Sequence, residues 1–157
     1  MKASRIIING VLIFLAIGIF FLIMEFAGLS DNIYLRLVNF AFVIYGINRT
    51  IKGNFEDNIH GYFTNIGAAL LTGLISLVLS IFAFMLYAEY KGGEAYLQNF
   101  ADTYIFGGSN PSPQQFSIGL FIEGLAGIVV TSFALMQYWK DKVEKINTVD
   151  DRAHNPH

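Results

Sequence analysis

The chain has 157 residues, of which 54% are hydrophobic and 14% are charged, and its mean hydropathy is +0.50. Soluble domains have roughly 25% charged residues, so this composition excludes a soluble fold and, equally, a disordered chain. The net charge of −2 offers no basic surface for nucleic acid, and the absence of cysteine excludes disulfides and cysteine-ligated metals. The composition predicts an integral membrane protein with a single domain.

Four apolar stretches are long enough, or nearly so, to cross a bilayer core, which takes about 20 helical residues. The first is interrupted only by Asn9 and Glu25, the second is short and contains Arg36, the third has no charge, and the fourth has only Glu123. We therefore predict an all-α bundle of four transmembrane helices within residues 1–140, followed by a polar tail over residues 141–157. The predicted spans are residues 6–28, 32–48, 65–87 and 115–139.

The first stretch could instead be a signal peptide, because Lys2 and Arg5 precede it. Its apolar run of about 18 residues exceeds the usual 7–15, and no small-residue cleavage site follows. We therefore expect it to be retained as a helix.

Basic residues lie mostly on one side of this predicted bundle. Only Lys91 and Arg36 fall on the side of the connection between spans three and four. The other eight are Lys2, Arg5, Arg49, Lys52, Lys140, Lys142, Lys145 and Arg152. Because loops rich in Lys and Arg stay in the cytoplasm, both termini are predicted to be cytoplasmic, in a bacterial inner membrane. Trp139 and Tyr138, next to Lys140, are expected to anchor the last span at the interface.

Three charged residues lie within the spans, where an ionised group is costly unless it faces protein or water. Helix rise places Glu25 roughly 5 Å, Arg36 roughly 7 Å and Glu123 roughly 12 Å from the outer side. One hypothesis is a Glu25–Arg36 ion pair with Glu123 as a third member; the alternative for the first two is snorkelling to the interface. Glu123 either holds the bundle together by a hydrogen bond or titrates as a site for a proton, a cation or a basic ligand.

Small and polar residues recur at every fourth position in spans three and four, which permits close helix approach. The two stripes are expected to meet in a helix-packing seam. This predicted seam comprises Ala69, Gly73, Ser76, Ser80, Gly119, Gly127 and Thr131.

The two longer connections have amphipathic patterns. Residues 49–64 are expected to form a short interfacial helix or a structured loop on the membrane. Residues 94–106 are expected to form an amphipathic helix that either rests on the outer leaflet or covers the bundle as a lid.

Motifs for catalysis are absent from the sequence: there is no glycine-rich phosphate loop, no H-E-x-x-H and no G-x-S-x-G. The histidines are His60, His154 and His157, none of them in a span, so a haem with two histidine ligands is not expected. We predict no enzymatic activity, no cofactor and no metal site.

Two segments carry a resemblance to a known family. Tyr45-Gly46-Ile47-Asn48-Arg49, and then Gly61-Tyr62-Phe63-Thr64 before a helix containing Ala68 and Gly73, resemble the bacterial membrane family called domain of unknown function 4199. The resemblance covers about residues 5–140 and implies four membrane helices, but it implies no activity and no site residues.

The sequence thus favours a non-catalytic accessory or structural subunit of a larger membrane complex, in contact with lipid and with other integral subunits or a second copy of itself. The alternative is a small ion- or proton-coupled carrier or channel that uses Glu123 with Glu25 and Arg36.

Overall fold

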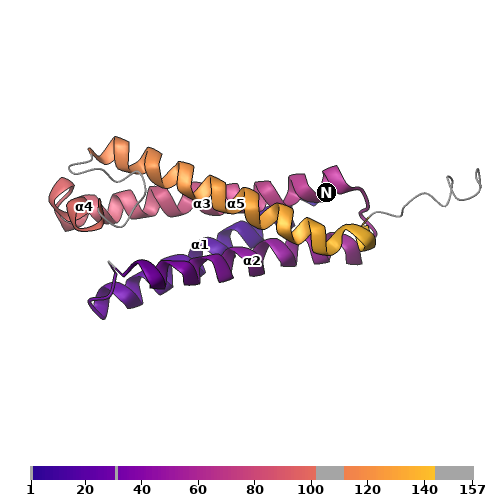
Figure 1. The fold of residues 1–157 in the computed structure, drawn as a ribbon, viewed down its shortest axis with the longest axis horizontal. Coiled ribbons are helices and arrows are strands. Elements are labelled where there is room, and N and C mark those ends of the chain that lie inside the picture. Colours follow the sequence, from indigo (N-terminus) through magenta and orange to yellow (C-terminus); the bar gives the residue numbers. More distant parts are fainter. Residues whose placement is uncertain (1, 31, 102–111, 144–157) are drawn as a thin grey trace, which may run out of the picture.

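The computed structural model describes residues 2–30, 32–101 and 112–143, which form a bundle of long helices (Figure 1). Every regular element in the described part is a helix, as predicted. The elements are α1 (Ala3–Phe26), α2 (Ile33–Glu56), α3 (Tyr62–Lys91), α4 (Glu94–Ala101) and α5 (Pro113–Val143). The predicted tail lies outside the described residues from position 144 onward.

A tight turn joins α1 to α2. Gly28 adopts a left-handed conformation with φ of 69°, which a residue without a Cβ tolerates, and this ends α1. The Asn32 side chain then accepts a hydrogen bond from the Tyr34 backbone N–H at 3.1 Å and caps the start of α2. The two helices therefore form an antiparallel hairpin, as the short connection predicts.

The helix expected on the membrane surface after residue 48 is wrong for its first half, because α2 continues through Glu56. Thr50, Ile51 and Asn54 are buried, so this part of α2 packs against the bundle and does not lie across its end. The connection to α3 is therefore only residues 57–61.

The helices pack around α3, which contacts α1, α2 and α5, while α2 also contacts α1 and α5. Within the described residues no Cα atom of α1 lies within 8 Å of a Cα atom of α5, so these two helices are separated by the others. The main apolar core lies toward the end of the bundle where α1 begins, called here the N-terminal end. It consists of Ile13, Ile47, Ile51, Ile66, Ala69, Ile128, Met136 and Trp139.

Trp139 was expected at the membrane interface, and that interpretation is wrong. Its side chain is only 7% exposed and its indole Nε1–H donates to Asn48 Oδ1 at 2.7 Å, so Trp139 ties α5 to α2 within the core. Its neighbour Tyr138 is exposed.

At the opposite end, called here the α4 end, the α1–α2 hairpin diverges from the α3–α5 hairpin (Figure 1). The short helix α4 caps only the second hairpin, since Leu97 is fully buried against Ala88 of α3 and Phe116 of α5. The helix predicted over residues 94–106 is present over Glu94–Ala101, and residues 102–106 lie outside the described part of the chain; whether it rests on the outer leaflet or acts as a lid stays a prediction.

The outer faces of the long helices are apolar and exposed. Three described helices, Ala3–Phe26, Tyr62–Lys91 and Pro113–Lys142, are long and apolar enough to cross a membrane. The charges in α2, among them Arg49 and Lys52, lower its hydropathy. The second predicted span therefore stays a prediction.

Candidate intramembrane site

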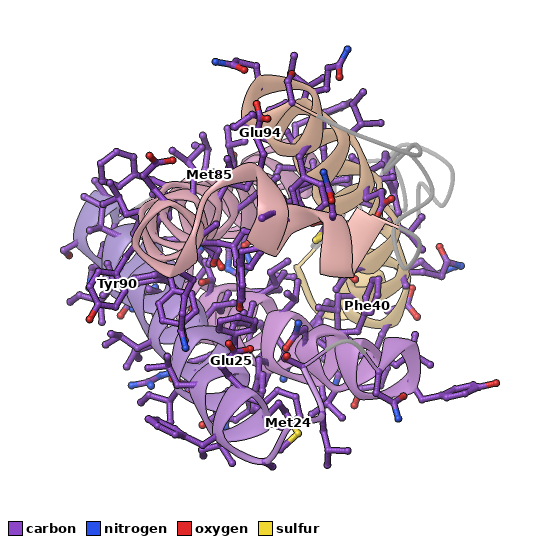
Figure 2. All side chains as sticks on the ribbon, turned by 90° about the vertical axis from the view of Figure 1, so that its left-hand side faces the viewer. Met24, Glu25, Phe40, Met85, Tyr90 and Glu94 are labelled. Atoms are coloured by element: carbon purple, nitrogen blue, oxygen red, sulfur yellow. The ribbon has the colours of Figure 1, made fainter. Side chains whose placement is uncertain are left out.

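A cavity of about 630 Å³ lies where the two hairpins diverge, lined by α1, α2, α3 and α5. Most of its lining is apolar. Its aromatic residues are Phe14, Phe21, Phe40, Phe84 and Tyr87. Figure 2, which looks along the bundle from the α4 end, shows Phe40 turned toward the middle of the bundle.

Four polar residues face this apolar space. Glu123 from α5, Asn39 from α2, and Ser76 and Ser80 from α3 all line the cavity. The Asn39 Oδ1 and Ser80 Oγ atoms are buried and have no hydrogen-bond partner among the described residues. Buried polar atoms are nearly always paired, so these two oxygens beside the cavity are exceptions to the usual pattern.

Glu25 lies beside the cavity, near the α4 end. Its carboxylate oxygen is 3.7 Å from Lys91 Nζ and lies 3.4 Å from the hydroxyl of Tyr87, which lines the cavity. Figure 2 shows Glu25 toward the middle of the bundle. Its described partners are thus on α3, whereas the expected partner was Arg36 on α2. The Arg36 side chain lies outside the described residues, so the Glu25–Arg36 pair stays a prediction.

Two glycines of the predicted seam lie in different helix contacts, one between α3 and α5 and the other between α5 and α2. A Cβ added to Gly73 would lie 2.5 Å from Ile128 Cγ2, so α3 and α5 approach closely there. A Cβ on Gly127 would lie 2.8 Å from Phe40 Cε1, so this glycine faces α2. Gly124, which was not in the predicted seam, packs against Leu77 of α3.

The other seam residues are found in the bundle interior or at the cavity. Ala69 is part of the core and Thr131 is buried. Gly119 is also buried, while Ser76 and Ser80 line the cavity. The stripe on α3 therefore supplies both packing surface and cavity wall.

A buried chain of polar side chains joins α1, α2 and α3 near the N-terminal end. Asn9 Nδ2 donates to Thr50 Oγ1 at 2.9 Å, and the hydroxyls of Thr50 and Thr72 are 3.1 Å apart. All three residues are almost fully buried. These hydrogen bonds connect three helices. They fix the rotation of each helix about its own axis, which apolar side chains alone specify poorly.

A second chain of hydrogen-bonded side chains lies closer to the N-terminal end of the bundle. Arg5 Nη1 donates to Asn54 Oδ1 at 2.9 Å, and Asn54 Nδ2 donates to Asn65 Oδ1 at 3.1 Å. Asn65 Nδ2 also donates to the backbone oxygens of Ile59 and Gly61, at 3.2 and 2.9 Å. Sequence reasoning missed this cluster. The available signal was spacing, because Arg5 and Asn9, like Thr50 and Asn54, are four residues apart and share a helix face.

Asp57 closes the cluster at the surface, where Lys2 Nζ lies 2.7 Å from its carboxylate and Arg5 also contacts it. Hydrogen bonds from Lys2, and then from Arg5, hold the pKa of Asp57 below its ordinary value of 3.8. Asp57 therefore stabilises the fold at pH values above the pKa of the unfolded state, and this contribution is lost as the pH falls through the lower folded-state pKa.

We expect Asp57→Asn to make the acid side of the stability profile slightly flatter and to change stability little near pH 7, because the carboxylate is solvent-accessible. Unfolding in detergent micelles between pH 2 and 7 measures this. Asp141→Asn, an exposed carboxylate at the end of α5, is the matched control. An identical acid limb for the wild type and Asp57→Asn contradicts the prediction.

Within the described residues, no group of three or more His, Asp or Glu side chains is placed to hold a metal ion. No family model, no curated protein and no solved structure matches the chain. The resemblance to domain of unknown function 4199 therefore stays a prediction. The function is inferred from the cavity and its polar residues.

Proposed function

We propose that the chain is a four-helix protein of a bacterial inner membrane, with α2 as the remaining span and both termini in the cytoplasm. At 24 residues α2 is about 36 Å long, which is enough to cross a hydrocarbon core of about 30 Å. It exposes large apolar side chains that do not line the cavity, among them Val38 and Ile44. The distribution of basic residues supports the orientation.

Single-cysteine variants test this topology cleanly, because the natural chain has no cysteine. We expect a membrane-impermeant maleimide to label Glu94→Cys, on α4, in spheroplasts from which the outer membrane has been removed. Asn58→Cys, in the loop between α2 and α3, is expected to react only after the inner membrane is permeabilised. The reverse pattern would show an inverted orientation, and labelling of both in intact spheroplasts would show that α3 does not cross. Ser30→Cys, in the turn between α1 and α2, tests α2 in the same way: it is expected to be labelled in intact spheroplasts while Asn58→Cys is protected, and equal labelling of these two would show that α2 does not cross.

We further propose that the protein works by binding and not by catalysis, as an accessory subunit of a larger membrane complex. The observation that carries this is the cavity between the hairpins, where Asn39 Oδ1 and Ser80 Oγ have no partner within the described chain. Hydrocarbon offers no water to satisfy them, so a molecule held within the bilayer is the natural complement.

Extraction from native membranes in a mild detergent, followed by native mass spectrometry, tests the accessory role. We expect a stoichiometric membrane-protein partner in two preparations, one tagged at the N-terminus and one after residue 157. Agreement between the two tags controls for capture by the tag. A single chain without a companion in both preparations contradicts this role.

The second candidate is a small ion- or proton-coupled carrier, which the position of Glu123 on the cavity favours. Carboxylates within spans commonly mark ion or proton pathways. In proteoliposomes with an internal pH dye, Glu123→Gln would abolish a proton flux that the exposed control Glu94→Gln leaves unchanged. Absence of flux in the wild-type protein contradicts this candidate alone.

A further inference from the structure

We propose that the cavity between the hairpins holds an acyl chain of a phospholipid from the leaflet at the α4 end. The inference rests on the proposal that this chain lies in a bilayer with α2 as a span. It requires neither a partner protein nor transport, and it requires no free charge in the cavity.

The cavity lies mostly in the half of the bundle nearer the α4 end. It is lined by residues within 14–22 of α1, 37–43 of α2, 73–87 of α3 and 120–128 of α5. At 1.5 Å per residue its wall is about 12 Å long on α1 and about 21 Å long on α3. One leaflet is half of a hydrocarbon core of about 30 Å, which is about 15 Å. The cavity therefore has about the depth of a single leaflet, and so does an acyl chain of that leaflet.

The surface that the cavity offers to an occupant is apolar. Its walls include Ile17, Val43 and Leu77 besides the aromatic residues named above. The unpartnered oxygens of Asn39 and Ser80 are buried within the wall and are not accessible from the cavity. Glu123 already has a partner within the protein. An occupant of this cavity therefore needs neither a hydrogen-bond donor nor a charge, and a hydrocarbon chain meets that condition.

Packing, and not transfer out of water, favours an acyl chain in this cavity. A chain in the bilayer is already in hydrocarbon, so it gains only the van der Waals contacts that fixed walls provide. Walls that face a void lose these contacts outright. The volume of about 630 Å³ falls within the usual range of about 300–1,000 Å³ for small-molecule sites. The cavity is open along part of its surface, so a chain can enter from the bilayer.

A transmembrane helix of a partner protein fits this cavity less well. Toward the N-terminal end α2 and α5 are in direct contact. A Cβ on Gly127 would lie 2.8 Å from Phe40 Cε1, and the Trp139 indole donates to Asn48 Oδ1 at 2.7 Å. A helix about 10–12 Å wide that crosses the whole core would find a recess along only part of its length. An acyl chain ends within its own leaflet and has no such continuation.

Charged groups at the α4 end of the cavity complement a phospholipid headgroup. Lys91 Nζ lies 5.5 Å from the ring centre of Tyr87, which lines the cavity. It also lies 3.7 Å from the Glu25 carboxylate, yet the Lys91 side chain is 41% exposed. An ammonium group has three N–H donors, so Lys91 can donate to a phosphate while it stays paired with Glu25. The headgroup then lies beside Lys91 while one chain enters past Tyr87.

The test extracts the full chain from native membranes in a mild detergent and measures bound lipid by native mass spectrometry. We expect the wild type to retain a single phospholipid after a detergent wash that removes lipid from the outer surface. Gly18→Leu is expected to lose this lipid, because Gly18 lines the cavity and a Cβ built on it meets no atom within 4 Å. Gly67→Leu is the matched control, since Gly67 also has open space around its Cβ but does not line the cavity.

A second variant fills the cavity from another helix and keeps the test decisive if Gly18→Leu does not fold. Ala83 of α3 lines the cavity, so Ala83→Leu is also expected to lose the lipid. Ala126→Leu, at an exposed position of α5 outside the lining, is its control. Palmitoyl-oleoyl phosphatidylethanolamine added to delipidated protein is expected to rebind to the wild type and both controls until each chain holds one molecule, and to neither filled variant.

Equal lipid retention by the wild type and the folded filled variants would overturn the proposal. So would the absence of a retained phospholipid from the wild type, or retention of a free fatty acid, a quinone or a partner protein that the filled variants release. Maleimide labelling and copurification with two tags are separate measurements. Failure of the lipid site is therefore distinguishable from failure of the proposed topology or of the accessory role.

Discussion

Replacing Gly73 by leucine is expected to destabilise the protein by about 3 kcal/mol, because α3 and α5 are too close at this point to admit a side chain. The new Cβ would lie 2.5 Å from Ile128 Cγ2 and 2.9 Å from Ile128 Cγ1. Ile128 is only 4% exposed and is branched at its own Cβ, so it has no flexible end that can move aside. The gain in helix propensity over glycine, about 1 kcal/mol, does not offset this clash. The free energy of unfolding, measured by sodium dodecyl sulfate titration in mixed micelles, gives the effect.

Gly67→Leu is the control for this substitution, since it makes the same chemical change on the same helix where nothing lies within 4 Å of the new Cβ. It is expected to be neutral or slightly stabilising. Adding Ile128→Ala to Gly73→Leu is expected to recover part of the loss, because it empties the space that the leucine needs. Equal destabilisation by the substitutions at Gly67 and Gly73 would show that the close approach of α3 and α5 does not set the cost.

Local features of the fold were predictable because they depend on neighbouring residues. The long apolar runs around Ile13 and Leu77 predict helices suited to an apolar environment. The four-residue repeat that contains Ala69 and Gly73 indicated a close contact between helices. The true end of α2 was missed because the charged residues on its exposed face resemble those of a loop. Lys52 and Glu56 look like loop residues in the sequence, yet they occupy one face of a helix whose other face is buried through Thr50, Ile51 and Asn54.

The cavity and the pairings of its residues were not predictable, because they depend on how the two hairpins are oriented relative to each other. Proximity along the chain suggested Arg36 as a partner of Glu25, and that pair stays a prediction, but it gave no sign of the contacts that Glu25 makes with Tyr87 and Lys91 on α3, more than sixty residues away. The sequence places Glu123 in an apolar stretch but does not show which helix faces it. Residues that contact across helices distant in sequence carry no local periodicity that reveals the pairing.

Asn65→Leu is expected to destabilise the protein by about 2 kcal/mol, although the two side chains have the same number of heavy atoms and the same branching pattern. Asn65 is fully buried, accepts from Asn54 Nδ2 and donates to the backbone oxygens of Ile59 and Gly61. The substitution leaves Asn54 Nδ2 and the Ile59 oxygen without this partner, whereas the Gly61 oxygen keeps the bond from the Asn65 backbone N–H. The bond to Asn54 joins two helices, and such a side-chain hydrogen bond contributes about 0.6 kcal/mol on average and up to about 1.7 kcal/mol. The unpaired Ile59 oxygen adds to this loss. The same unfolding titration measures the change.

A double-mutant cycle separates the hydrogen bond from general effects of burying leucine. If Asn54 and Asn65 act as a pair, the double variant Asn54→Leu/Asn65→Leu loses less stability than the sum of the single variants, with a coupling of about 1 kcal/mol. Thr64→Val, an exposed neighbour of Asn65 on α3, is expected to change stability by less than about 0.5 kcal/mol. Strict additivity of the two asparagine substitutions would mean that apolar packing, and not this polar chain, holds α2 against α3 at the N-terminal end.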